Sequence, residues 1–351
     1  VFIKEIHPKY KKNGEISNVG IKFLGDEWRS VCGPFSRIDL PEFNLGSRQQ
    51  IGRHLQYFGW KPDNFTEKGH VIVDEAILSK AQIQSWLDAV EEDGRVRGYV
   101  NTIGAVTGRM THSSPNMSQV PASYSPYGTE CRSCWTVPKG RKLVGADASG
   151  IELRMLAHYM NDKEYTHEIL HGDIHSANQK AAGLTTRDTA KTFIYAFLYG
   201  AGDRKIGSIV GGSATDGARL KTLFLDNTPS LRDLRERVER ATVRGHLRGL
   251  DNRKLIIRSN HAALNTLLQS AASVVMKKSL TILDEYAKIY GIDYKFVGNI
   301  HDEFQAEVRE DQAEKFGWLA VECIKAAGIK FNLRCPLDGE YKVGKTWAET
   351  H

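Results

Sequence analysis

The sequence lacks any hydrophobic run long enough for a membrane helix. No stretch of its 351 residues approaches the roughly 18 consecutive apolar residues of a membrane span. Its first residues show no charged and then apolar leader, so we expect neither a membrane partner nor secretion. The chain starts at Val1 rather than at methionine. We therefore expect a fragment, with any N-terminal domain lying before it.

Cysteine is scarce as well. Five cysteines, an odd number in a long chain without a leader, indicate a reducing compartment and no disulfide framework, so we expect the cytoplasm. Cys131 and Cys134 form a lone CxxC, with no second pair and no nearby His-x3-His to complete a zinc site. We interpret these two cysteines as structural.

Repeats, low-complexity tracts and Pro/Ser-rich linkers are also absent, so any lobes are joined by packed structure. A chain of 351 residues can fill two or three such lobes. The formal net charge of +6 is a modest excess over this length. Alone, it is only a weak indication of a polyanionic partner.

Local patterns predict a mixture of strands and long helices. A short apolar run, 142–146, is typical of a buried strand that ends at Asp147. Strands over 294–300 and 304–308 flank His301-Asp302-Glu303 as a hairpin with acids at its tip. With short strands in 1–45 and loops in 99–121, the fold class is α+β with an antiparallel sheet. Helical spacing and capping signals cover 47–58, 74–90, 187–199, 230–247 and 261–278.

Two of these helices carry further signals. Thr185 followed by Asp188 is a capping-box pattern at the start of the helix over 187–199, and Gly200 supplies its stop. The helix over 230–247 is highly charged, and we interpret it first as a solvated face and second as a nucleic-acid contact. Its opposite charges fall at i,i+4 in the pairs Arg232/Glu236, Arg235/Glu239 and Glu236/Arg240.

Asp147 and Asp302 are each predicted at a strand end, where a sheet edge presents a carboxylate at the floor of a cleft. Taken singly, such an aspartate is more often a helix cap or a turn residue. Together, the two could hold metal ions as nucleotidyl transfer requires. Carboxylate oxygens bind Mg²⁺, and two ions about 4 Å apart activate the attacking hydroxyl and stabilise the leaving oxygen.

The helix between these acids carries Arg187, Lys191 and Tyr195 at intervals of four residues, which places two cations and a ring along one face. This face suits a nucleoside triphosphate, because the cations neutralise phosphates and the ring lies near sugar and base. A solvated basic face is the plainer interpretation of Lys191 by itself. The acids on either side favour the triphosphate.

These segments resemble, in order, the motifs of family A DNA polymerases. Asp147 to Arg154 resembles the first palm motif, and His301-Asp302-Glu303 the second. Arg187-x3-Lys191-x3-Tyr195-x3-Tyr199-Gly200 resembles the fingers helix that closes over the nucleotide. Thr107-Gly108-Arg109 and the helix with Asn265 and Gln269 also resemble family positions, so the likeness runs from about Tyr99 to the C-terminus.

The likeness is greatest to the replicative polymerases of short-tailed phages. Gly172-Asp173-Ile174-His175, the stretch 262–270 and the ending Trp347-Ala348 before His351 are phage-like. The resemblance therefore implies phage-type replication and, for a viral source, the host cytoplasm. It implies primer-template DNA and dNTPs as partners, and two Mg²⁺ ions for which Mn²⁺ can substitute.

The resemblance also implies a role for each matching residue. Asp147 and Asp302, with the backbone carbonyl of Ala148, would bind both metals, and Glu303 and Lys191 would join them in catalysis. Arg187, Lys191 and His175 would bind the triphosphate, although His175 could equally be a core histidine. Glu152 would exclude a 2′-hydroxyl, and Tyr195 would lie on the 3′ side of the incoming sugar.

On the DNA, the resemblance places Tyr199 against the template, while Arg109, Asn265 and Gln269 reach the minor groove at the primer end. Minor-groove acceptors are similar for every correct pair, so such contacts test geometry without reading sequence. His301 would lie close to the primer terminus. Polar packing against a loop is the alternative for Asn265 and Gln269.

The implied fold is a right hand. Residues 1–45, 99–164 and 261–351 would form the palm, 46–98 a helical thumb and 165–260 helical fingers. The thumb is shorter than in the family, which suggests residues missing near Lys80/Ala81. A processivity factor is not identifiable, and no Asp-x-Glu proofreading site is visible. The alternatives are a single-subunit RNA polymerase, which Glu152 argues against, and an inactive primer-template binding protein.

Overall fold

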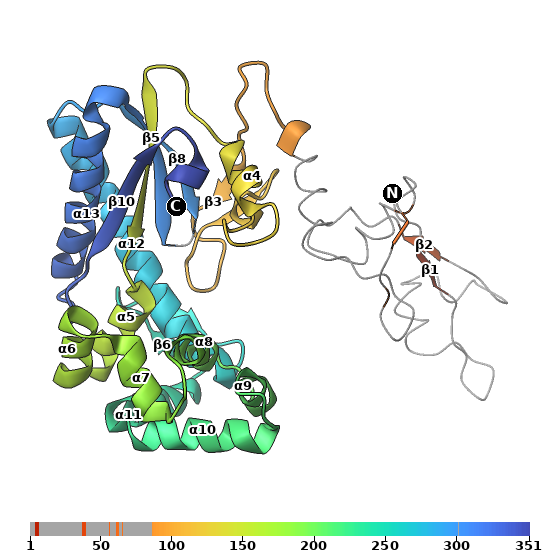
Figure 1. Cartoon of the computed structure of the whole chain (residues 1–351), viewed down its shortest axis with the longest axis vertical. Coiled ribbons are helices and arrows are strands. Elements are labelled where there is room, and N and C mark those ends of the chain that lie inside the picture. Colours follow the sequence, from red (N-terminus) through yellow and green to blue (C-terminus); the bar gives the residue numbers. More distant parts are fainter. Residues whose placement is uncertain are drawn as a thin grey trace. The chain divides into compact units, whose positions relative to one another are not determined.

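The computed structural model describes residues 4–6, 37–39, 56, 61–62, 65, 86–300 and 302–351 (Figure 1). The chain divides into two compact units, Val1–Leu87 and Asp88–His351. In the first unit, β1 (Lys4–Ile6) pairs antiparallel with β2 (Arg37–Asp39). Most of the region predicted as thumb, with the helices over 47–58 and 74–90, lies outside the described residues. The following paragraphs concern the second unit.

A four-stranded antiparallel sheet in the order β10-β5-β9-β8 forms the centre of this unit. The prediction of an α+β fold with an antiparallel sheet is confirmed. The predicted strand before Asp147 and the acidic hairpin are present as β5, β8 and β9. The strands span Arg141–Ala148 (β5), Tyr294–Ile300 (β8), Glu303–Arg309 (β9) and Gly339–Gly344 (β10).

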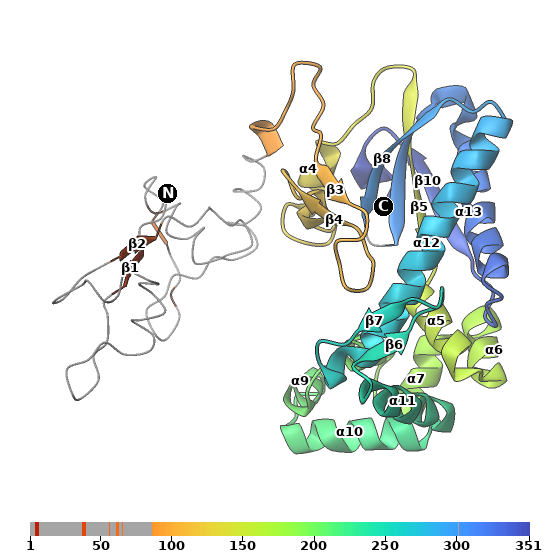
Figure 2. The same ribbon diagram turned by 180° about the vertical axis from the view of Figure 1, so that it is seen from behind.

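Two long helices, α12 (Ala263–Ile289) and α13 (Ala313–Lys330), cover one side of the sheet. Figure 2 shows α12 running from the β6–β7 hairpin along the sheet beside α13. α13 packs on β5 and β10, and α12 packs on α13. Phe304, Ala306 and Val308 of β9 are fully buried, as is Phe316 of α13, so apolar burial holds this layer together.

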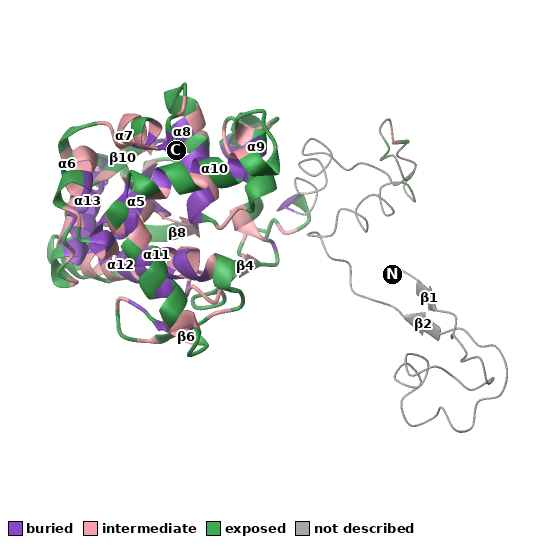
Figure 3. Ribbon diagram, turned by 90° about the horizontal axis from the view of Figure 1, so that it is seen from below, coloured by how far each residue is buried: buried purple, intermediate pink, exposed green. Residues whose placement is uncertain are grey.

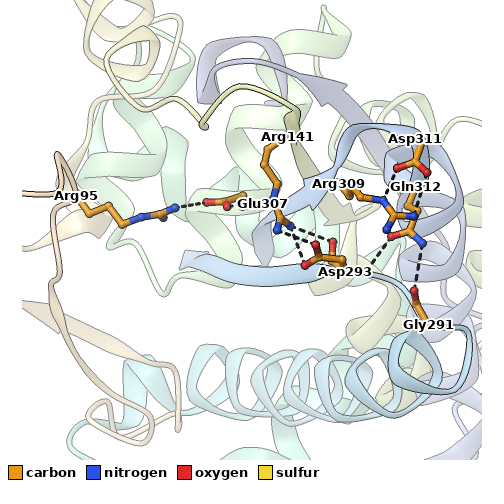
Figure 4. A network of polar contacts seen from close by, with 8 residues as sticks. All are labelled: Arg95, Arg141, Gly291, Asp293, Glu307, Arg309, Asp311 and Gln312. Carbon is orange, nitrogen blue, oxygen red and sulfur yellow. Dashed lines mark hydrogen bonds and ion pairs between the residues drawn. The ribbon is translucent and has the colours of Figure 1, made fainter.

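The other face of β9 is polar yet also buried. Glu303, Gln305 and Glu307 alternate with the apolar residues, and each is at most 6% exposed. In Figure 4, Glu307 accepts a hydrogen bond from Arg95 at 2.8 Å, and Arg141 Nε lies 3.7 Å from it. Because a buried charge needs a partner, Glu307 anchors the segment before β3 to the sheet.

Helices form the rest of the unit below the sheet in Figure 1. Their buried faces turn inward and their exposed faces outward (Figure 3). Phe193 and Phe197 of α8 pack edge-on against Phe224 of α10, with ring centroids 5.1 and 5.4 Å apart. The helices are α5 (Ile151–Met160), α6 (Lys163–His171), α7 (Ile174–Ala182), α8 (Arg187–Leu198), α9 (Asp203–Ile209), α10 (Ala214–Asp226) and α11 (Pro229–Thr242).

Short elements complete the unit. Strands β3 and β4 lie within the region predicted as loop, and they flank the Thr107-Gly108-Arg109 motif. A small hairpin, β6–β7, follows α11. The bounds are Tyr99–Asn101 (β3), Thr111–Ser113 (β4), Gly128–Ser133 (α4), His246–Arg248 (β6) and Lys254–Ile256 (β7), with 3₁₀ turns at Met117–Gln119, Asn260–Ala262, Glu310–Gln312 and Trp347–Glu349.

Three helix boundaries differ from the predictions. α8 is capped by Thr186, whose side chain accepts from the backbone N–H of Thr189, and not by Thr185. α11 ends at Thr242, because Gly245 adopts a positive φ of 73° and the chain turns into β6. α12 ends at Ile289, eleven residues beyond the predicted end at 278.

The charge pairing predicted on α11 is also largely replaced by tertiary contacts. Of the three predicted pairs, only Glu236 and Arg240 form an ion pair, at 3.9 Å. Arg232 pairs instead with Asp226 of α10, and Arg235 lies over the ring of Phe197 at 5.2 Å. The helix therefore packs on its neighbours through its arginines as well as its leucines.

None of the helices in the described part of the chain has the length and apolar character needed to cross a bilayer.

The buried ion pair of Glu307 gives a stability prediction. Glu307→Gln should lower the free energy of unfolding by about 1–3 kcal/mol, because Arg95 loses its anionic partner, whereas Arg141 keeps its ion pair with Asp293. Glu310→Gln is the control, since the Glu310 side chain is 58% exposed beside Lys142 and its loss should cost under about 0.5 kcal/mol. Urea unfolding followed by circular dichroism measures both. Equal effects from the two variants would contradict this account.

Candidate active site

The sheet brings Asp147 and Asp302 together. Asp147 lies opposite Glu303 in the β5–β9 register, and the backbone N–H of Ala148 donates to the carbonyl of Asp302 at 3.4 Å. Although Asp147 is partly open to solvent, desolvation by the surrounding protein and the charge of Asp302 raise its pKa to about 7. Burial raises the pKa of Asp302 too, against the pull of Arg109. The two carboxylates therefore need a positive charge close by to stay ionised at neutral pH.

Arg109 supplies the balancing charge. Its Nη2 lies 3.0 Å from both carboxylate oxygens of Asp302 and 3.2 Å from Oε1 of Glu152. The three side chains are only 15–16% exposed. Burial and the charge of Asp302 raise the pKa of Glu152, and Arg109 counteracts both. Sequence reasoning placed Arg109 on DNA and did not find this pairing with the acids.

α8 presents its predicted face beside these acids. Lys191 is exposed and forms no ion pair with another described residue. Burial and the charge of Glu152 raise the pKa of Tyr195 to about 12, and the charges of Asp302 and Asp147 also contribute. Tyr195 of α8 therefore lies near the pair of acids.

His175 joins this face from α7. Its ring centroid lies 6.2 Å from that of Tyr195. Burial lowers the pKa of His175, and the positive charges of Arg187 and Lys191 lower it further. His175 is therefore largely neutral at pH 7, and its Nδ1 is buried with no hydrogen-bond partner in the described structure. The geometry favours a site residue over a satisfied core histidine.

Asp173 is a member of the site that sequence reasoning missed. It accepts from Nε of Arg187 at 2.6 Å, from Oγ of Ser176 at 2.8 Å and from the backbone N–H of His175 at 3.1 Å. These hydrogen bonds, led by that of Arg187, hold the pKa of Asp173 well below its usual range. The signal was present in Gly172-Asp173-Ile174-His175, from which only the histidine was assigned a role.

Glu303 lies in a different environment from the two aspartates. It accepts from Nε1 of Trp347 at 2.9 Å, from Nδ1 of His351 at 2.5 Å and from Gln305. Burial would raise the pKa of Glu303, but these donors together bring it below its ordinary value. Its contacts fasten the C-terminal segment beneath the site. A direct catalytic role for Glu303 remains a prediction.

The remaining predicted residues lie around this centre. Tyr199 caps α8 and is 47% exposed, and burial and the charge of Glu152 raise its pKa. Asn265 and Gln269 are partly buried on α12, one turn apart, without a hydrogen bond to another described residue. His301 is outside the described residues. These predicted roles are not tested by the geometry.

The chain is similar to several curated proteins. A DNA-directed DNA polymerase of Enterobacteria phage T3 and one of Escherichia phage T7 are each 40% identical over 91% of this chain and 54% of their own length. DNA polymerase I of Pseudomonas aeruginosa is 26% identical over 88% of the chain and 39% of its own length. The chain thus spans about half the length of the phage relatives.

The fold has a solved counterpart. The POL domain of Pol1 from M. smegmatis, in complex with DNA primer-template and dNTP, superposes with a TM-score of 0.72 at 23% identity, covering 87% of this chain and 61% of that one. The sequence model of DNA polymerase family A matches residues 76–349, which include the acids and all of α8. The chain therefore belongs to DNA polymerase family A.

Proposed function

We propose that this chain is the polymerase portion of a DNA-directed DNA polymerase, which transfers dNTPs to a primer 3′-hydroxyl under direction of a template. One observation carries the proposal: Asp147 and Asp302 converge near Tyr195 of α8, a helix that also carries the exposed Lys191 four residues earlier. The names of both phage relatives support it. In this proposal the β10-β5-β9-β8 sheet is the palm, and residues 165–260 are the fingers.

The donor set fits a hard divalent cation. The charge of Asp302 raises the pKa of Asp147, so a cation between the two would be stabilised. Carboxylate oxygens are the ligands that Mg²⁺ and Mn²⁺ prefer. No cluster of three or more His, Cys, Asp or Glu side chains suited to a metal occurs among the described residues. The proposed ligands are therefore two carboxylates and the carbonyl of Ala148. Bound Mg²⁺ ions would activate the attacking hydroxyl and stabilise the leaving oxygen.

The chain's own residues bind and orient the nucleotide. Arg187 and Lys191 offer positive charge to the phosphates, and neutral His175 offers a ring N–H without adding a further charge. Tyr195, held between His175 and Tyr199 by ring contacts of 6.2 and 6.4 Å, lies toward the sugar. Closure of α8 over the acids would exclude water from the reacting atoms.

Glu152 supports selection of deoxyribonucleotides. Its side chain is only 15% exposed, so an added 2′-hydroxyl beside it would find little free space. A single-subunit RNA polymerase would prefer ribonucleotides, and an inactive binding protein would extend neither. Primer extension with dNTPs or rNTPs separates the three functions. Preference for rNTPs, or tight primer-template binding without extension in Mg²⁺ or Mn²⁺, would overturn the proposal.

Arg109, Asn265 and Gln269 are proposed to contact the minor groove at the primer end, with His301 nearby and Tyr199 against the template. Such contacts require Arg109 to leave Asp302. A primer terminus would thus free the carboxylate that a metal needs. Binding of primer-template and of metal would then favour one another.

The first prediction concerns turnover. Asp147→Asn or Asp302→Asn should each lower kcat by at least about 100-fold, because each removes a charged ligand while keeping its shape. For Asp147→Asn, at a residue that does not pair with Arg109, primer-template affinity should change by less than about threefold, since DNA contacts are chiefly to phosphates. Single-turnover extension and fluorescence anisotropy measure the two effects. Asp311→Asn, on the exposed turn after β9, is the control. Near-normal turnover in either active-site variant would refute the assignment.

A second prediction concerns pH in the absence of metal and DNA. The pKa of Asp147 is about 7 in the folded chain, whereas the ordinary pKa of an aspartate is 3.8. The folded state therefore loses stability relative to the unfolded state as pH rises from 4 to 7. Asp147→Asn removes this penalty and should raise the free energy of unfolding at pH 8 by ~1 kcal/mol, a value reduced for solvent screening, with little change at pH 4. Urea unfolding in EDTA measures it. An equal effect at both pH values would count against the raised pKa.

A third prediction concerns Arg109 as a competitor of the metal. Arg109→Ala should raise the Mn²⁺ affinity of the DNA-free protein by at least about tenfold, because a cation at 3 Å from Asp302 is removed. Electron paramagnetic resonance of free Mn²⁺ measures this without catalysis. Arg97→Ala removes an exposed arginine that pairs with Asp93 and should change nothing. Unchanged affinity in the Arg109 variant would show that the pairing does not block the metal.

A further inference from the structure

We propose that Lys277 of α12 is a positioning residue that holds the loop of Arg109 in register with the two aspartates. The inference rests on the proposed polymerase function. It concerns a residue that lies two turns beyond Gln269 on α12 and touches none of the acids.

The ammonium of Lys277 forms hydrogen bonds to both ends of the turn over 102–108. Its ammonium donates to the carbonyl of Thr102 and to the carbonyl of Gly108, which lie on either side of a compact loop between β3 and β4. The loop closes on itself through Gly108 N–H to the Ala105 carbonyl at 2.8 Å and Ala105 N–H to the Arg109 carbonyl at 3.2 Å. Lys277 thus binds two carbonyls that the turn does not use internally, those of Thr102 and Gly108.

The loop also lies close to the side chain of Arg253, which leaves no room for a larger residue at Gly108. Gly108 has a φ of +78°, and a Cβ there would lie 2.7 Å from Nη1 of Arg253, which follows the β6 strand. Burial lowers the pKa of Lys277, and the charge of Arg253 lowers it further. A half-buried ammonium beside a guanidinium is costly, so its two carbonyl acceptors are needed to keep it there.

The next residue after this loop is Arg109. Its position depends on the backbone of Gly108, because Nη2 must reach both Asp302 and Glu152. α12 also carries Asn265 and Gln269. By tying the loop to α12, Lys277 makes the three proposed minor-groove residues one rigid unit. Small errors in such positioning have large effects on rate.

The test uses Lys277→Met, which keeps the aliphatic stem and removes the donors, and Lys277→Arg, which restores donors. Lys278→Met is the matched control, since the neighbouring lysine is also half-buried and its ammonium makes no hydrogen bond or ion pair with another described residue. Lys277→Met should lower kcat on matched primers about tenfold with little change in the KM for dNTP. Lys277→Arg should recover most of this loss.

A double-mutant cycle separates positioning from general destabilisation. In an Arg109→Ala background, Lys277→Met should cost less than about twofold in kcat, because both act through the same guanidinium. Lys277→Met should also raise the Mn²⁺ affinity of the DNA-free protein toward that of Arg109→Ala, a readout independent of catalysis. Multiplicative losses in the cycle, or a Lys277→Met protein equal to Lys278→Met, would overturn the inference. Failure of the wild-type chain to extend a primer would instead overturn the proposed function.

Discussion

The site depends on repulsion between two carboxylates that the sheet forces together. β5 and β9 pair so that Asp147 lies opposite Glu303, and Asp302 then has no freedom to move away. Desolvation and this repulsion raise the pKa of Asp147, so the pair favours a nearby cation. Arg109 supplies one to Asp302. The same demand for charge makes the pair fit for metal ions.

The sheet can impose this repulsion because it is anchored on both faces. On one side, Phe304, Ala306 and Val308 are buried under α12 and α13. On the other, the buried Glu303 and Glu307 each have donors from distant segments: Trp347 and His351 for the first, Arg95 and Arg141 for the second. Charged groups without such partners would be too costly to bury. The polar partners therefore fix the strand whose first residues form the acidic turn.

Local sequence patterns were enough to predict the elements whose residues repeat with a single regular spacing. The runs before Asp147 and around Asp302 gave β5, β8 and β9, and the i,i+4 spacing gave the face of α8. The pattern was insufficient at the end of α12, where Leu283 and Ala287 continue the buried stripe. On β9 the alternation is typical of a strand with one face in water, yet loops and the C-terminal segment cover that face.

Partners across the chain could not be predicted, because no local period encodes them. Arg109 and Asp302 are 193 positions apart, and Arg95 and Glu307 are 212 apart. A buried carboxylate indicates only that some cation lies nearby. The chain has 48 lysines and arginines, and the local sequence does not show which of them is the partner. The resemblance gave Arg109 a role on DNA, which describes a state with substrate present. The structure adds the ion pair with Asp302, which the resemblance did not imply.

The two arginines of the site differ in how readily they can exchange partners. Arg187 and Asp173 are 52% and 40% exposed, so water screens their ion pair and, in the proposed function, triphosphate oxygens would replace the aspartate at little cost. Arg109 and Asp302 are 16% and 15% exposed, and separating them leaves two poorly solvated charges. A primer terminus and a metal ion arriving together would satisfy both charges, whereas either alone would leave one unpaired. In the proposed function, the ion pair of Arg187 would therefore exchange partners more readily than the ion pair of Arg109.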